Sequence, residues 1–210
     1  MMKLGLISDI HADAKSLKRA LDILQGQGVD RILCAGDLVD KGTEGDAVVA
    51  LIRERGIPSV VGNHDWLEER NQHYLLRNFG QNHPMLLTEE TLAFLDTLPD
   101  TLTYELEGRR ILVAHATPWS RDEYVFPYSK PALFKQVAQY AEADVVILGH
   151  THEPMIALVD DVTIFNPGSV CGLHEHGSGT CATLTLPDLI FRVFNLHTGE
   201  RVQPAYLEHV

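Results

Sequence analysis

The sequence has no long apolar run, and only three of its 210 residues are cysteines. A membrane-spanning helix needs about 20 consecutive apolar residues, so none is expected. The chain reaches Ser8-Asp9 before an apolar signal segment could form, and we therefore expect a cytoplasmic protein. Cys34, Cys171 and Cys181 are odd in number and widely spaced, which predicts reduced packing residues and neither a disulfide framework nor a C-x-x-C site.

Basic residues are also scarce, with 17 Lys and Arg against 29 Asp and Glu and a formal net charge of -12. Proteins that bind long nucleic acids usually cluster Lys and Arg to displace counterions, so long DNA or RNA is not expected as a partner. Repeats, low-complexity segments and linkers are absent too. A hydrophobic content of 45% over this length predicts one domain, residues 1–210, with a core of its own.

Short apolar runs alternate with helical patterns in the first half of the chain. Residues 4–7, 31–35 and 59–61 predict strands, while residues 14–25 and 44–55 predict helices. This alternation is typical of βαβ units around a parallel sheet, and the fold class is therefore α/β.

The second half has helical spacing between residues 66 and 100 and then becomes rich in strand patterns. Residues 101–106 and 110–114 predict a hairpin that turns at Glu107-Gly108. Antiparallel pairs are expected here, because tight turns separate the later strands. The remaining predictions are a helix at 131–141 and strands at 145–148, 155–159, 162–165, 180–186 and 189–194.

Polar side chains follow five of the apolar segments at the point where each one ends. The carboxyl ends of parallel strands meet in one crevice, so these side chains are expected to converge. A glycine precedes Asp37, Asn63 and His150, which predicts that the backbone approaches a small ligand there. Each segment alone is also typical of turns or helix caps, but five at strand ends favour a site. They contain Asp9 and His11, Asp37 and Asp40, Asn63 and His64, His115, and His150 and His152.

The residue types in these segments indicate which metal they would bind. Imidazoles, carboxylates and an amide oxygen, with no thiolate, suit Mn, Fe, Zn or Ni better than an all-oxygen calcium site. Asp9-x-His11 and His150-x-His152 would each place two ligands on one side of an extended segment. Each pair is therefore predicted to bind a metal ion.

In this order the five segments resemble the calcineurin-like metallophosphoesterase superfamily, whose signature is D-x-H, G-D-x-x-D, G-N-H-[DE], a lone His and G-H-x-H. Asn166-Pro167-Gly168-Ser169 is similar to the N-P-G-S turn of its small bacterial and archaeal phosphodiesterase branch. The resemblance covers nearly the whole chain. It implies a four-layer α/β/β/α sandwich, two mixed sheets flanked by helices, with a bimetal site at one edge.

The resemblance also implies hydrolysis of small phosphodiesters or nucleotide-like substrates. Two divalent transition-metal ions (Mn, Fe, Zn or Ni) would lower the pKa of a bridging water and clamp the phosphoryl oxygens. His64 would contact the phosphate and protonate the leaving oxygen, while Asp40 would hold its other ring nitrogen. The implied ligands are Asp9, His11 and His152 for one metal and Asn63, His115 and His150 for the other, with Asp37 bridging both.

Two segments depart from the pattern or lie outside it. Residues 170–177 stand where many members of the branch carry Pro-Arg, so no arginine contact to phosphate is expected there. His174 and His176, within this segment, either approach the site or lie on an exposed loop that binds adventitious metal. The loop from Trp119 to Tyr128 has the aromatics and arginine to stack a base and meet a phosphate, or to form a dimer contact. Homo-oligomerisation thus stays open.

Other functions remain open as well. One is a phosphomonoesterase or protein phosphatase, and another is a non-catalytic metal-binding scaffold, as in a retromer subunit that keeps the fold but lacks the acid histidine. The intact Asn63-His64-Asp65 argues against a scaffold, although Asp65 is expected only to cap a helix beginning at Trp66. Lys41 follows Asp40, where protein phosphatases typically have arginine, so a small phosphodiester is favoured.

Overall fold

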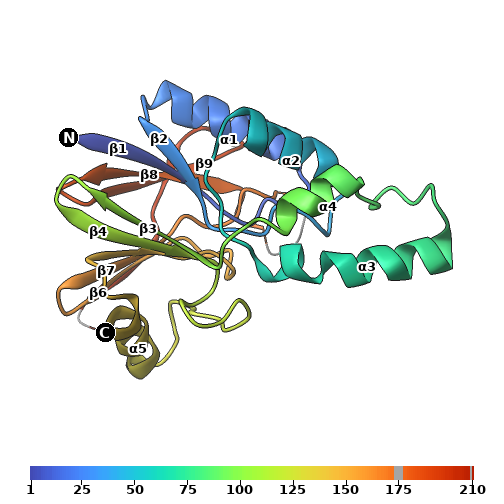
Figure 1. The fold of residues 1–210 in the computed structure, drawn as a ribbon. Helices are drawn as coiled ribbons and strands as arrows, with labels where there is room; N and C mark the ends of the chain where they lie inside the picture. Colours follow the sequence, from blue (N-terminus) through green and yellow to red (C-terminus); the bar gives the residue numbers. More distant parts are fainter. Residues whose placement is uncertain (173–176, 209) are drawn as a thin grey trace.

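Two mixed β-sheets lie face to face in the computed structural model, with helices on both outer faces (Figure 1). The structure describes residues 1–172, 177–208 and 210, without the side chains of residues 67–71. The expectations for His174 and His176 therefore lie outside the described residues. The predicted four-layer sandwich is confirmed. None of the described helices is long and apolar enough to cross a membrane.

The first sheet has five strands, with β8 (Thr180–Leu186) at its centre and the N-terminal strand β1 (Met2–Ile7) beside it. β1 pairs in parallel with β2 and antiparallel with β8, which in turn pairs antiparallel with β9. Strand order across the sheet is β10 (Arg201–Val202), β9 (Ile190–Asn195), β8 (Thr180–Leu186), β1 (Met2–Ile7) and β2 (Arg31–Cys34).

The second sheet has six strands and a parallel centre. β5 pairs in parallel with both β4 and β7, the pairs β3–β4 and β6–β7 are antiparallel, and β11 at the edge pairs in parallel with β6. Strand order is β11 (Ala205–Leu207), β6 (Met155–Val159), β7 (Val162–Asn166), β5 (Val145–Ile147), β4 (Arg109–Ala114) and β3 (Thr101–Leu106).

Helices α1 (Ala14–Gly26) and α2 (Gly45–Glu54) cover the first sheet, and α5 (Pro131–Ala141) covers the second (Figure 1). α1 begins where the side chain of Asp13 accepts a hydrogen bond from the backbone N–H of Ser16 at 2.9 Å, a typical N-cap. α4 (Glu89–Leu95) contacts both α2 and α3 (Asn63–Phe79), and α3 reaches away from the sheets (Figure 1).

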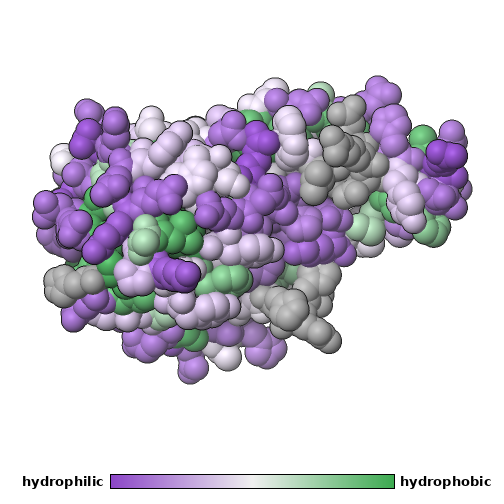
Figure 2. Space-filling model, turned by 90° about the horizontal axis from the view of Figure 1, so that it is seen from below, coloured by the Kyte–Doolittle hydropathy of each residue, from purple (hydrophilic) through white to green (hydrophobic). Residues whose placement is uncertain are grey.

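The apolar side chains form three layers, because each strand turns alternate residues to opposite faces. In β4, Ile111 and Val113 point into the core between the sheets, whereas Leu112 and Ala114 pack under α5. The third layer lies between the first sheet and helices α1 and α2. From below, the surface is mostly hydrophilic, with apolar residues only in small areas (Figure 2).

Three local features differ from the sequence prediction. Residues 59–61 form no strand, only an isolated bridge between Ser59 and Cys34. The backbone N–H of Val61 donates to the carbonyl oxygen of Pro99, which lies outside the first sheet. α3 begins at Asn63 rather than Trp66. β10 and β11 were not predicted, because strands of two and three largely exposed residues carry no hydrophobic periodicity.

Candidate metal centre

All nine predicted site residues come together at one edge of the sandwich. They follow the carboxyl ends of β1, β2, β4 and β5 or begin α3. Six of them form two groups whose ligand atoms lie within 4.8 Å of one another. The first group is Asp9, His11 and His152, and the second is Asp37, His115 and His150.

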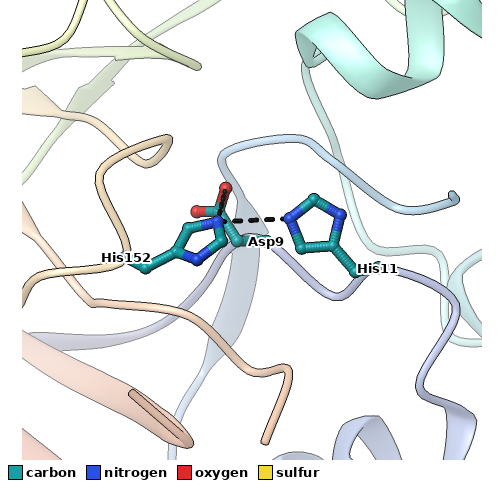
Figure 3. Close-up of side chains that lie close together, drawn as sticks. All are labelled: Asp9, His11 and His152. Carbon is teal, nitrogen blue, oxygen red and sulfur yellow. Dashed lines mark hydrogen bonds and ion pairs between the residues drawn. The ribbon is translucent and has the colours of Figure 1, made fainter. Parts of the chain in front are cut away.

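The first group joins the loop after β1 to the loop after β5. Nε2 of His152 lies 3.2 Å from Oδ1 of Asp9 and 3.2 Å from Nε2 of His11 (Figure 3). Two ring nitrogens and a carboxylate oxygen therefore point at one small volume. Such a set of nitrogen and oxygen donors suits a divalent transition ion.

The second group is oriented by the backbone. Nδ1 of His115 donates to the carbonyl oxygen of Ala35 at 2.7 Å, so Nε2 carries the lone pair when the ring is neutral. Around this Nε2 lie Oδ1 of Asn63 at 3.0 Å, Nδ1 of His150 at 3.2 Å and Oδ2 of Asp37 at 3.3 Å. An electron pair facing other acceptors needs a proton or a cation between them, and the residues therefore fit a bound metal ion.

Asp37 lies between the two groups. Its Oδ2 is 3.3 Å from Nε2 of His115 and 3.7 Å from Nε2 of His11. Its Oδ1 accepts a hydrogen bond from the backbone N–H of His64 at 3.0 Å, which fixes the carboxylate. One carboxylate thus faces both candidate metal positions.

Burial and charge set the ionisation of these residues. Burial lowers the pKa of His11 and of His150 to about 4, which leaves both rings neutral and able to bind a cation. Burial also opposes a charge on His115, but Asp37 and Asp9 raise its pKa to about 10. For Asp37, burial favours the neutral form, but the charge of His115 and its hydrogen bond outweigh burial and hold the pKa of Asp37 far below its usual range. Without a metal, a proton on His115 therefore takes the place of the cation.

His64 and Asp40 form a pair beside these groups. Nδ1 of His64 lies 2.7 Å from Oδ2 of Asp40, and because a carboxylate only accepts, Nδ1 is the donor. Burial lowers the pKa of His64, but the hydrogen bond to Asp40 and the charge of Asp37 give a net rise. His64 lines a cavity of about 290 Å³ with Lys41, Tyr124, His150 and His152.

The backbone of the site is left-handed where the sequence predicted extended segments. Asp9 (φ 53), His11 (φ 49), His150 (φ 67) and His152 (φ 61) all have positive φ, which is strained for residues other than glycine. His150 and His152 fall in different groups, as the resemblance implies, so the pairing predicted from their spacing alone is wrong. Asp9 and His11 share a group although both are left-handed, so this backbone conformation does not by itself decide which residues face one metal position.

Two glycines of the site lie against its carboxylates. A Cβ on Gly62 would lie 2.0 Å from Oδ1 of Asp37, and a Cβ on Gly149 would lie 2.9 Å from Oδ2 of Asp9. These glycines bring the backbone close to the site's own carboxylates. Neither has a positive φ, whereas Gly36 does.

Several positioning residues were missed or only partly predicted from sequence. Asn166 donates to the carbonyl oxygen of Gly149 at 2.7 Å, and Ser169 donates to that of Asp9 at 2.9 Å. The N-P-G-S turn therefore holds the loops that follow β1 and β5. Asp65 accepts from Gly62 at 2.9 Å, as a helix cap should, but its other oxygen accepts from Leu38 at 2.8 Å. It therefore also anchors the loop that carries Asp37. Of these residues, the sequence singled out the N-P-G-S motif, and it indicated Asp65 only as a helix cap.

Comparison with known proteins agrees with this geometry. A sequence model described as the calcineurin-like phosphoesterase superfamily domain matches residues 2–188. A phosphodiesterase of Methanocaldococcus jannaschii is 25% identical over 184 residues, 81% of this chain and 86% of that protein. Phosphodiesterase YfcE of Escherichia coli is 27% identical over 172 residues, 81% of this chain and 80% of that protein.

A solved structure gives the same result. The crystal structure of a metallophosphoesterase from Sphaerobacter thermophilus superposes with a TM-score of 0.72 at 26% identity, over 97% of this chain and 89% of the other. The superfamily resemblance of the five motifs is confirmed. The chain belongs to the calcineurin-like phosphoesterase superfamily and is a metal-dependent phosphoric ester hydrolase.

Proposed function

We propose that this protein is a phosphodiesterase that hydrolyses small phosphodiesters with two divalent metal ions. The observation that carries the proposal is the position of Asp37, whose carboxylate faces both three-residue donor groups. The names of the relatives in M. jannaschii and E. coli support the reaction class.

The proposed ligands follow from the contacts. Asp9, His11 and His152 would hold one ion, and His115, His150 and Asn63 the other, with Asp37 between them. The neutral state of His11 and His150 favours binding, since a metal competes with protons for the ring nitrogens. Divalent ions held there, of which Mn, Fe, Zn and Ni suit these ligands, would supply hydroxide at neutral pH and offset charge on the phosphoryl oxygens.

His64 is proposed as the general acid. An alkoxide leaving group is unstable in water at neutral pH, so a proton delivered as the P–O bond breaks lowers the barrier. Asp40 orients the ring through Nδ1, which leaves Nε2 to deliver the proton in the cavity shared with Lys41. The ammonium of Lys41, which lies 3.2 Å from Nε2 of His11, would attract the substrate anion despite the acidic protein.

The test compares p-nitrophenyl phosphate, a monoester, with bis(p-nitrophenyl) phosphate, a diester. Protein stripped of metal is assayed before and after Mn, Ni, Zn or Mg is restored. We expect metal-dependent turnover with a higher kcat/KM for the diester. Faster monoester turnover would favour a phosphomonoesterase or protein phosphatase. Two bound metals without turnover of any ester, including small natural diesters, would favour the scaffold.

We also propose that residues 1–210 act as one domain in the cytoplasm. The core between the sheets joins residues of the first strand to residues of the late strands β8 and β9, which supports one folding unit. Cys34, Cys171 and Cys181 are buried free thiols, as expected for a protein kept in a reducing compartment.

A further inference from the structure

We propose that a second cavity beside the metal centre binds a nucleoside as the arm of the phosphodiester that stays on phosphorus. This inference rests on the proposed diesterase function, since only a diester has such an arm. It makes the substrate a nucleotide ester, in which a nucleoside and a second alcohol share one phosphate.

The cavity opens directly onto the candidate metal centre. It has a volume of about 660 Å³, within the usual range of small-ligand sites. Asn63 and His115 belong both to its wall and to the second donor group. A phosphate held at the metal centre can therefore extend one ester arm into this cavity. The rest of the wall comes from the start of α3, Asp100, the loop 117–122 and Tyr140.

Aromatic side chains in the wall provide a stacking surface. The ring of Trp66 is 63% exposed, and the guanidinium of Arg121 lies over it at 4.3 Å from the ring centroid. Across the loop, Trp119 packs against Tyr140 with centroids 5.2 Å apart. An exposed indole is costly to leave in water, and a nucleobase stacks well on such a ring.

The charges of this cavity oppose an anionic occupant. Arg121 donates to the carboxylate of Asp100 at 2.7 Å, so its positive charge is already paired. Asp122 adds a further carboxylate to the wall. A second phosphate would be repelled here, whereas ribose hydroxyls can donate to these carboxylates. The wall therefore suits an uncharged ring that carries hydroxyl groups, which is the chemistry of a nucleoside.

The other cavity is left for the departing alcohol. His64, the proposed acid, lines the 290 Å³ cavity and does not line the larger one. A group that receives its proton from His64 must leave on that side. The arm in the larger cavity consequently remains attached to phosphorus and appears in the product as a nucleoside monophosphate.

The structure also favours substrate contact over a dimer contact for the aromatic loop. Tyr124 stacks on the ring of His150, with centroids 4.0 Å apart and planes inclined by 26°. Phe126 lies parallel to Tyr124 at 5.1 Å, and both line the smaller cavity. The loop thus forms walls of both cavities beside the metal centre.

The experiment uses three p-nitrophenyl esters that differ only in the arm kept on phosphorus: thymidine 5′-phosphate, methyl phosphate and unsubstituted phosphate. With metal-loaded protein, we expect kcat/KM to be highest for the thymidine ester. Trp66→Ala should lower kcat/KM for that ester by about 5- to 150-fold, the effect of losing one base–aromatic stack, and leave the methyl ester unchanged. Trp66→Phe should restore part of the loss.

Tyr74→Ala is the matched control, because Tyr74 lies on the same helix, is 60% exposed and lines neither cavity. Equal rates for the thymidine and methyl esters, or equal losses on both in Trp66→Ala, would overturn the inference. So would loss of an oligomer in Trp66→Ala, seen by light scattering, with unchanged kinetics.

A binding measurement separates this inference from the proposed function. Thymidine 5′-monophosphate is titrated into metal-loaded protein by calorimetry, with methyl phosphate as the reference ligand. Tighter binding of the nucleotide that Trp66→Ala abolishes supports the nucleoside cavity even if no ester is hydrolysed, in which case only the diesterase proposal fails. Equal affinity for the two ligands refutes the cavity assignment even if the esters are cleaved.

Discussion

Asp40 accepts a hydrogen bond from His64 at 2.7 Å, and this pair stands beside the donor groups without belonging to either. The side chains of His64 and Asp40 are 24% and 17% exposed, whereas those of His115 and Asp37 are 1% exposed. A residue that exchanges protons with a substrate must be reachable, and a ligand that only holds a metal need not be. The difference in exposure supports different roles for the two sets.

Replacing His64 with alanine tests the general acid. We expect His64→Ala to keep its metals and to lower kcat for an alkyl diester by roughly 10²- to 10⁴-fold. A nitrophenyl ester should lose much less, because nitrophenolate leaves without a proton. Metal content is measured by mass spectrometry beside both rates. Loss of metal would make His64 a ligand, and equal losses on both esters would remove its role as an acid.

Asp40→Asn tests the orienting hydrogen bond. An amide can still accept from Nδ1 of His64 but carries no charge, and it removes one cause of the raised pKa of His64. The basic limb of the rate against pH for the alkyl diester should therefore move to lower pH, since His64 would lose its proton earlier. An unchanged profile with a lower rate would leave Asp40 with a purely structural role.

Asp37→Asn tests the carboxylate between the two groups. A neutral amide binds cations more weakly, so at least one metal should be lost and turnover with it. Asp161→Asn is a suitable control, because that carboxylate lies in the exposed turn between β6 and β7. Full occupancy of both metals in Asp37→Asn would refute the proposed bridging position.

Metal binding should release a proton from His115. At pH 7 a group with a pKa of about 10 is charged, and the metal needs the lone pair of its Nε2. Calorimetry in buffers of different ionisation enthalpy should therefore find at least one proton released per protein near neutral pH, with any proton from metal-bound water in addition. No release would show that His115 is already neutral without metal.

The same residue predicts a pH dependence of stability. The folded pKa of His115 lies above its ordinary value of 6.5, so its protonation stabilises the metal-free fold below pH 6.5. That contribution is lost as the pH rises through about 10. Urea unfolding of metal-free protein should show falling stability over this window, whereas metal-loaded protein should not show the His115 contribution. Burial and the charge of Asp37 raise the pKa of Asp65 to about 6, so Asp65 titrates below the pH window in which His115 contributes.

Much of the fold was predictable because most strands are long enough to show a hydrophobic pattern. β4 and β8 lie where apolar residues run together, and α5 has the predicted bounds. Residues 59–61 are as apolar as a strand, but the single bridge to Cys34 shows that packing, not pairing, buries them. The hydrophobic pattern of a short segment cannot distinguish a paired strand from an unpaired buried segment, since both place apolar side chains in the core.

The composition of the site was also predictable, but its geometry was not. The site residues could be identified as polar residues that follow apolar runs, because the ends of the strands converge in this fold class. The resemblance implied that His150 and His152 belong to different groups, whereas their spacing indicated one group, because that argument assumes an extended backbone and both residues are left-handed. The place of Trp66 beside Arg121 depends on a contact between residues 55 positions apart, and spacing alone gives no sign of it.

Gly149 offers a test of this backbone geometry. The N–H of His150 donates to Oδ2 of Asp9 at 3.0 Å, and a Cβ on Gly149 would lie 2.0 Å from Oγ of Ser8 and push against the same carboxylate. Gly149→Ala should therefore cost roughly 1 to 3 kcal/mol of stability, as overpacked sites do, and weaken metal binding by displacing Asp9.

Gly26→Ala is the matched control for that change. Gly26 ends α1 with no atom within 4 Å of an added Cβ and without a positive φ, so alanine should leave stability equal or slightly higher. Urea unfolding and metal titration of both variants decide the matter. If Gly149→Ala matched Gly26→Ala in stability and metal affinity, the approach of the backbone to Asp9 would not hold the first donor group in place. A loss confined to Gly149→Ala would show that metal affinity depends on this close approach, because the two substitutions add the same methyl group.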